Sequence, residues 1–277
     1  MATFQLPDRV ACYRHADHLA GVHCTRCGRP ICLDCMVVAP VGHHCPTCVT
    51  EGAQGSGAGS RLGRRPGRSS RLTPVVAALI VINGAVFVLT TTHRTWEFDY
   101  AQIPSLVAHR QAYRLLTATF VHENIPHLVF NMAALFISGP PIERALGRRR
   151  FVLLYLLAAL GGSVCSFVFG PVLVAGVGAS GAIFGIFGAW FSLARAQRSE
   201  TGVIMLLIAI LLAYSFYDTA IDWRAHVGGL VTGVVVGATY AWAARRPARQ
   251  RLAYQGAVVV GLLAVLAALV LVRAAQL

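Results

Sequence analysis

The sequence predicts an all-α membrane protein in which seven transmembrane helices follow a small N-terminal metal-binding module. Hydrophobic residues occupy 56% of the 277 positions and charged residues only 13%, whereas soluble domains carry about 25% charged residues. Apolar stretches close to the ~20 residues that cross a bilayer recur along most of the chain. Seven of the eight cysteines fall between Cys12 and Cys48, before the first such stretch.

Composition divides the chain into three segments. Residues 1–50 form the cysteine- and histidine-rich module, and residues 51–71 are rich in Gly, Ser and Arg, which is typical of a flexible linker. Residues 72–277 form the membrane domain. The N-terminus does not begin with a basic stub followed by an apolar core, so we expect no secretory signal and a cytoplasmic N-terminus.

We expect seven membrane spans, of which the second and the fifth are short, as suits helices shielded within a bundle. The expected ranges are 73–91, 126–142, 151–169, 180–198, 202–217, 225–243 and 254–273. Arginines cluster in the linker and after the even-numbered spans, whereas acidic residues dilute the arginines of the opposite loops. By the positive-inside rule the N-terminus is cytoplasmic, and the seventh span leaves the C-terminus outside.

The net charge of +13 raises the question of a nucleic-acid partner. All 24 basic residues are Arg, which indicates a GC-rich genome, and we expect a bacterial source. Many of these arginines lie in short clusters between apolar spans, where membrane topology accounts for them. We therefore expect a multi-pass cell-membrane protein that contacts lipid, and no nucleic-acid partner.

The N-terminal module contains four closely spaced pairs of metal-binding residues. The pairs are Cys12 with His15, Cys24 with Cys27, Cys32 with Cys35, and Cys45 with Cys48. Eight ligands fill two tetrahedral structural zinc sites, and a reducing compartment favours metal over disulfides. Because a segment of about fifty residues builds little core, we expect zinc to supply its folding energy. With every ligand position filled, no catalytic zinc is expected; which pairs share an ion stays open, a cross-brace being one arrangement.

Four strongly polar side chains lie inside the expected spans, where such groups are costly and mark function. His127 and Asn131 belong to the second span, Ser180 opens the fourth and His226 opens the sixth. The expected topology places all four at the outer ends of their helices. They can therefore meet in one cavity that opens to the outside.

Ser180 lies between glycines, in Gly178-Ala179-Ser180-Gly181. Taken alone, such a motif is more often helix-packing composition than a nucleophile. Small residues recur every fourth position along this span and the sixth, at Gly181, Gly185, Gly229, Gly233 and Gly237. Close approach of these two helices would bring Ser180 within about 2.6–3.2 Å of His226, which favours a nucleophile and its general base.

The remaining polar residues allow two interpretations each. His127 and Asn131 share one face of their span and could donate hydrogen bonds to a developing oxyanion, or could bond only to each other and to neighbouring helices. Asp222 lies one turn before His226, where it could orient the imidazole as a third catalytic member. A helix cap at the interface is the stronger interpretation of Asp222.

In order and spacing, roughly residues 73–243 resemble the rhomboid family. The matching motifs are Tyr113-Arg114, His122 with His127 and Asn131, Gly178–Gly181, and Ala225-His226 with Gly229 and Gly233. The resemblance implies that Ser180 is the nucleophile, His226 its base, and His127 with Asn131 the oxyanion donors. It also implies a bundle of six plus one helices and an aromatic, Phe184, packed against the base. Tyr113 departs from the family's usual Trp, in a loop pair that is structural.

The N-terminal module resembles B-box-type zinc fingers, without a close match to their His-rich end. Together the resemblances imply a serine endopeptidase that cleaves transmembrane protein substrates without a catalytic metal, while its zinc module contacts a protein partner. The alternative is a catalytically silent rhomboid-like protein that binds membrane clients, although inactive relatives typically lack the Ser or the His. A transporter would need paired intramembrane acids or an internal repeat, and the sequence has neither.

Overall fold

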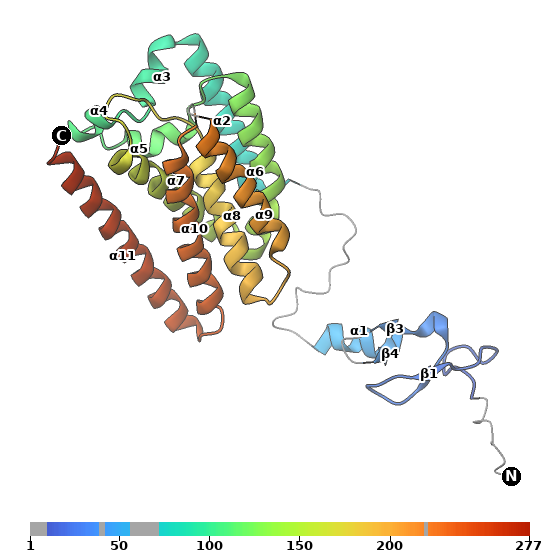
Figure 1. The fold of residues 1–277 in the computed structure, drawn as a ribbon. Helices are drawn as coiled ribbons and strands as arrows, with labels where there is room; N and C mark the ends of the chain where they lie inside the picture. The colour runs from blue at the N-terminus through green and yellow to red at the C-terminus, as the bar shows by residue number, and fades with distance from the viewer. Residues whose placement is uncertain (1–9, 39–41, 56–71, 219–220) are drawn as a thin grey trace. The chain divides into compact units, whose positions relative to one another are not determined.

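The computed structural model describes residues 10–38, 42–55, 72–218 and 221–277, and the chain forms two compact units, Met1–Ser69 and Ser70–Leu277. Most of the expected linker, residues 56–71, lies outside the described residues. Figure 1 shows the elements of both units along the chain.

The N-terminal unit is built from short elements around its cysteines. Two antiparallel strand pairs, β1 (Val22–His23) with β2 (Pro30–Ile31) and β3 (Val37–Val38) with β4 (His43–His44), are accompanied by η1 (Leu33–Cys35) and α1 (Pro46–Gly55). Six cysteines and Ile31 form its buried cluster. Such a core contains almost no large apolar side chains, so hydrophobic burial contributes little to this unit.

The membrane unit consists of helices. The longer ones are α2 (Pro74–Thr92), α6 (Ile125–Leu146), α7 (Arg148–Phe169), α8 (Ser180–Ala196), α9 (Gly202–Tyr217), α10 (Trp223–Ala243) and α11 (Ala248–Ala274). Between α2 and α6 the chain forms α3 (Arg94–Tyr100), α4 (Pro104–Ala108), α5 (Arg114–Thr117) and η2 (Ala118–Phe120). Among the described residues, five helices are long and apolar enough to cross a membrane: α2, α6, α7, α10 and α11. The chain is therefore a multi-pass membrane protein, with α8 of 17 and α9 of 16 residues between the longer helices.

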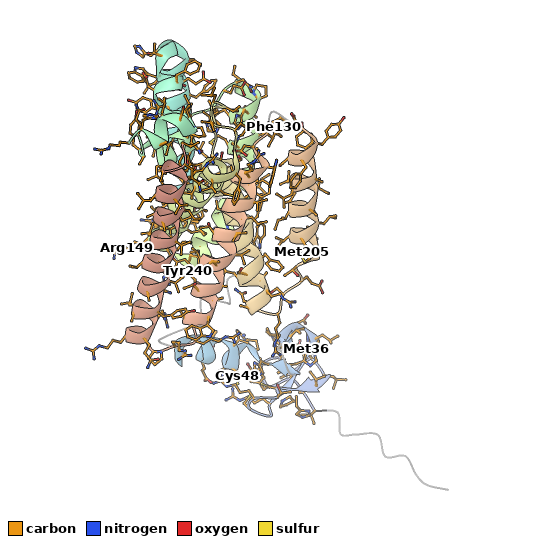
Figure 2. The ribbon with its side chains drawn as sticks, turned by 60° about the vertical axis from the view of Figure 1, so that its left-hand side comes forward. Met36, Cys48, Phe130, Arg149, Met205 and Tyr240 are labelled. Carbon is orange, nitrogen blue, oxygen red and sulfur yellow. The ribbon has the colours of Figure 1, made fainter. Side chains whose placement is uncertain are left out.

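Helices α7, α8 and α10 pack against one another and form the centre of this unit, while α2 packs on α6. Both views place α9 and α11 on opposite sides of α10 (Figures 1 and 2). Burial follows this arrangement, because 61% of the apolar window of α7 is buried but only 6% of that of α11. The outer helices therefore present their apolar side chains to lipid.

Glycines set the distance between α8 and α10. A Cβ atom on Gly229 would lie 1.9 Å from the Gly181 carbonyl oxygen, and one on Gly233 would lie 2.0 Å from that of Gly185. Real Cβ atoms do not approach backbone atoms this closely, so only glycine fits at these positions. The expected close contact of the two small-residue stripes is confirmed.

The expectation of a short second span is wrong. Helix α6 runs through Pro140 and Pro141 to Leu146, 22 residues in all, although prolines weaken a helix interior. Its last turns are anchored by tertiary contacts: the Glu143 carboxylate accepts hydrogen bonds from the backbone N–H groups of Val75 (3.2 Å) and Val76 (3.0 Å) at the start of α2. These bonds also satisfy two of the free N–H groups at that helix end.

The segment between α2 and α6 is folded around a buried arginine. Arg114 donates to the carbonyl oxygens of Phe98 and Ala101 and to Gln111 Oε1. This buried guanidinium therefore fixes the end of α3 to the segment that opens α5. The expected structural role of the Tyr113-Arg114 pair is therefore confirmed for Arg114.

Candidate active site

Ser180 and His226 lie side by side where α8 and α10 begin. Ser180 is the first residue of α8, His226 lies one turn into α10, and Ser180 Oγ is 2.8 Å from His226 Nε2. His226 is 6% exposed, whereas Ser180 is only partly buried and remains within reach of a second reactant. This separation permits direct proton transfer from the hydroxyl to the imidazole.

The chain before Ser180 is held in a defined turn. Gly178 has φ +115°, a conformation that favours glycine, and its N–H donates to the Ala118 carbonyl (2.9 Å). A Cβ atom on Gly178 would lie 2.6 Å from Nε2 of His127, so glycine also makes room for that ring. Upstream, Gln102 and Gly176 exchange backbone hydrogen bonds of 3.0 and 2.8 Å. Ser180, the candidate nucleophile, therefore follows a loop whose backbone is held in place by hydrogen bonds.

Ser215 of α9 binds the other side of the His226 ring. Its Oγ is 2.7 Å from Nδ1 of His226 and donates its proton to the Leu211 carbonyl, 2.6 Å away. A carbonyl only accepts and a hydroxyl has one proton, so Ser215 accepts a hydrogen bond from Nδ1–H. With its proton on Nδ1, neutral His226 presents the lone pair of Nε2 to the Ser180 hydroxyl. This is the tautomer that a general base requires.

Phe184, one turn into α8, stacks on the imidazole. The ring centroids of Phe184 and His226 are 4.2 Å apart with an interplanar angle of 17°. The expected packing of this aromatic against the histidine is confirmed. Together with the hydrogen bonds at both ring nitrogens, this stacking holds the His226 ring in a single orientation.

Asp222 does not bind the histidine. It is the N-cap of α10, where one carboxylate oxygen accepts from the Arg224 N–H (3.1 Å) and the other accepts from the Ser166 hydroxyl. The cap interpretation is confirmed, and the interpretation of Asp222 as a third catalytic member is wrong. Ser215 occupies the place beside Nδ1 that a triad carboxylate would take.

His127 and Asn131 lie next to the Ser180 loop. The His127 ring faces Gly178, and the Asn131 side-chain amide donates to the His127 carbonyl (2.9 Å), which leaves a second amide proton. Beside them is His122, 2% exposed, whose ring lies 5.1 Å from that of His127 and has no hydrogen-bond partner among the described residues. Burial, with the neighbouring His127, lowers the pKa of His122 to about 4, so this ring is neutral at pH 7.

Backbone donors complete this corner of the site. The first N–H groups of a helix, here including that of Ser180, have no intrahelical acceptor, and the N-cap Ala179 offers them no side-chain acceptor. The helix dipole adds positive potential there. An anion that forms near Ser180 would therefore meet the Ser180 N–H, with the side chains of His127 and Asn131 nearby.

Known proteins share this part of the chain. The Rhomboid domain matches residues 109–243. GluP of Bacillus subtilis (strain 168), a rhomboid protease, is 40% identical over 166 residues, 58% of this chain and 31% of GluP. YdcA of the same organism, also named for the rhomboid family, is 30% identical over 175 residues, 60% of this chain and 88% of YdcA. The chain belongs to the rhomboid family.

This rhomboid matches its relatives over different shares of their length. RHOMBOID-like protein 6, mitochondrial, of Arabidopsis thaliana is 33% identical over 155 residues, which cover 49% of that protein. The chain spans about a third of GluP but most of YdcA. The domain match begins at residue 109 and does not include the cysteine-rich unit.

That unit of the rhomboid chain brings its ligand pairs together in two groups. Cys12, His15, Cys32 and Cys35 form one, and Cys24, Cys27, Cys45 and Cys48 form the other, with the ligand atoms of each group within 4.8 Å of one another. The first pair thus meets the third and the second meets the fourth, as in a cross-brace. The exposed residues His18 and Asp34 also approach Cys32, but that cysteine already belongs to the first group. Both groups of four have the donor set and number of a structural zinc site.

Sequence reasoning missed Ser215. Its signal was present: a polar residue within the apolar fifth span, eleven positions before His226. Serine is common as a packing residue in membrane helices, so the residue type alone does not single it out. Its 2% exposure and its contact with His226 depend on how α9 packs beside α10.

Proposed function

We propose that this rhomboid is an intramembrane serine endopeptidase in which Ser180 is the nucleophile and His226 its general base. The observation that supports this most directly is the hydrogen-bonded series from the Leu211 carbonyl through Ser215 and His226 to Ser180, which leaves Nε2 free to accept the Ser180 proton. Relatives named as rhomboid proteases support the same class of activity.

In the proposed reaction Ser180 Oγ attacks the carbonyl carbon of the scissile peptide bond and its proton moves to Nε2. The oxyanion accepts hydrogen bonds from the Ser180 N–H and from His127 and Asn131. Nε2–H then protonates the leaving amine, the C–N bond breaks, and an acyl-enzyme remains on Ser180. A water that gives a proton to Nε2 hydrolyses this ester and regenerates the hydroxyl.

The proposed substrates are transmembrane segments of other proteins. We count α8 and α9 as spans together with the five longer helices, which makes seven. The arginine distribution then supports a cytoplasmic N-terminus and an outer C-terminus. Ser180 and His226 then open to the outer side, where water is available. A helical substrate must unwind locally, because helical peptide bonds are shielded from attack.

For the N-terminal unit we propose two structural zinc ions and a B-box-like role in protein contact. Cys12, His15, Cys32 and Cys35 would hold one ion, and the four remaining cysteines of the unit the other. Thiolate and imidazole donors suit zinc, and each set of four leaves no open position for a reactant. The zinc would contribute folding energy and take no part in hydrolysis.

A serine-directed fluorophosphonate tests the proposal. The purified wild type should be labelled at one site, and Ser180→Ala should not be labelled. The same preparation should cleave a reporter protein whose transmembrane segment carries fluorophores on both sides. Equal labelling of wild type and Ser180→Ala, or a labelled wild type that cleaves no transmembrane reporter, would favour the silent client-binding alternative.

A further inference from the structure

A groove of about 730 Å³ lies between α7, α10 and α11, far from the candidate active site. Its α10 residue, Tyr240, is fourteen positions beyond His226, or roughly 21 Å along the helix at 1.5 Å per residue. The volume is within the range of about 300–1,000 Å³ found for small-molecule sites. Figure 2 labels two of the side chains that line it, Arg149 and Tyr240.

One wall of the groove is cationic. Arg148, Arg149 and Arg150 open α7 and line the groove, which has no acidic lining residue. No ion pair formed within the described parts of the chain involves these three arginines. The preceding carboxylate, Glu143, is engaged by backbone N–H groups of α2. Gly147, the N-cap, supplies no side-chain cap, so the positive end of the α7 dipole adds to the same potential.

Two buried polar groups beside the groove lack protein partners. Gln255 is 9% exposed and forms no side-chain hydrogen bond with the described residues, although it is one of two buried residues of α11. The Tyr240 hydroxyl is buried and also has no partner among those residues. Polar groups that lack a protein partner favour a ligand that can hydrogen-bond to them.

The remaining walls are apolar and open to the lipid side. Leu153 of α7 and Leu252 and Val259 of α11 line the groove, and Leu252 is 69% exposed. A soluble anion would gain nothing from these side chains, whereas an acyl chain would cover them. Basic pockets between membrane helices are suited to anionic lipid headgroups.

We propose that this groove binds one anionic phospholipid. The phosphate lies against Arg148–Arg150 and the start of α7, Gln255 and Tyr240 hydrogen-bond to headgroup or glycerol oxygens, and an acyl chain runs past Leu153, Leu252 and Val259. The lipid thereby joins α11, which has little protein packing of its own, to α7 and α10. This proposal does not depend on the catalytic assignment.

Native mass spectrometry of the full-length protein, titrated with phosphatidylglycerol or phosphatidylcholine of identical acyl chains, tests it. Wild type should bind one phosphatidylglycerol at least about tenfold more tightly than phosphatidylcholine. R148Q/R149Q/R150Q should weaken phosphatidylglycerol binding about 100-fold, because each cation near an anionic headgroup contributes roughly fivefold. Gln255→Leu, which keeps the volume, should weaken it about tenfold through one lost charge-assisted bond.

The matched control is R245Q/R246Q/R249Q, which removes the same charge from the α10–α11 turn and the first turn of α11, outside the groove, and should change binding no more than about fivefold. An equal loss in this control would show attraction by surface charge alone and overturn the proposal. Equal binding of the two lipids, or displacement of phosphatidylglycerol by millimolar inorganic phosphate, would also overturn it. Should the groove triple variant fail to fold, unchanged binding by folded Gln255→Leu would count against the site.

Discussion

In the candidate site, the Leu211 carbonyl determines which nitrogen of the His226 ring carries the proton, although two hydrogen bonds separate them. The Leu211 carbonyl takes the Ser215 proton, so Ser215 accepts from Nδ1 of His226 and Nε2 accepts from Ser180. A neutral hydroxyl stabilises a protonated imidazole less than a carboxylate would. It can still hold the ring and its tautomer, which are needed before the proton moves.

We predict that Ser180→Ala and His226→Ala each lower cleavage of a transmembrane reporter by on the order of 10⁴-fold or more. The two side chains act as a unit through one 2.8 Å contact, so the double variant should be hardly slower than either single variant. Turnover numbers in detergent and thermal melting curves measure the effect and the fold. Residual activity near wild type in folded Ser180→Ala would eliminate Ser180 as the nucleophile.

Ser215→Ala should lower kcat about 10- to 100-fold with little change in KM, since one hydrogen bond to a charged imidazolium is lost. Ser215→Thr should restore much of the rate, because threonine also bonds to the carbonyl four residues earlier. ¹⁵N NMR of the histidines should show His226 protonated at Nδ1 in wild type and a mixture of tautomers in Ser215→Ala.

Ser138→Ala is the matched control for that experiment. Ser138 is also buried and also donates to the carbonyl four residues earlier (2.7 Å), but no histidine accompanies it. Its kcat and the His226 signals should stay as in wild type. If Ser138→Ala and Ser215→Ala lowered the rate equally, Ser215 would be a packing residue only.

At the scale of elements, the contact between α8 and α10 brings the two candidate catalytic residues together. We predict that Gly229→Val lowers the rate at least about 100-fold, because even ~1 Å of displacement can have that effect and the new side chain must move Gly181. Gly261→Val on α11 has no atom within 4 Å of the new Cβ and should leave the rate unchanged. Normal turnover by well-folded Gly229→Val would show that helix proximity does not position His226.

At the scale of the whole molecule, the two compact units have separate sources of stability. The membrane unit buries apolar side chains between helices, whereas the N-terminal unit buries mainly cysteines. We predict two zinc ions per full-length chain by elemental analysis, with Cys12→Ser and Cys24→Ser each losing one of them because they belong to different groups. Cys165→Ser, outside both groups, should keep both ions. A single zinc in wild type would contradict the pairing.

Removing residues 1–60 should leave cleavage of the reporter intact, since Ser180, His226 and Ser215 all belong to the unit that begins at Ser70. Chelation of zinc from the full-length protein should likewise unfold only the N-terminal unit. Circular dichroism should then report the unfolding, while turnover of the reporter stays unchanged. A truncated protein with a normal melting curve and no turnover would show that the N-terminal unit takes part in hydrolysis.

The sequence by itself determined the membrane class, the positions of the seven longer helices to within about six residues at each end, and the candidate catalytic residues Ser180 and His226. Apolar length, arginine clusters and costly intramembrane polar groups are local properties, readable without contacts. The glycine repeats also predicted the close approach of α8 and α10, because absence of a side chain is visible in the sequence.

Only the tertiary structure decided which partner each polar group has. Glu143 near the end of α6 bonds to the start of α2, and Asp222 bonds to the Arg224 N–H and to Ser166 of α7. The tautomer of His226 depends on Ser215, a residue of a different helix. Hydrogen bonds of this kind join residues far apart in the chain, and their geometry follows from helix packing, which composition and spacing do not specify.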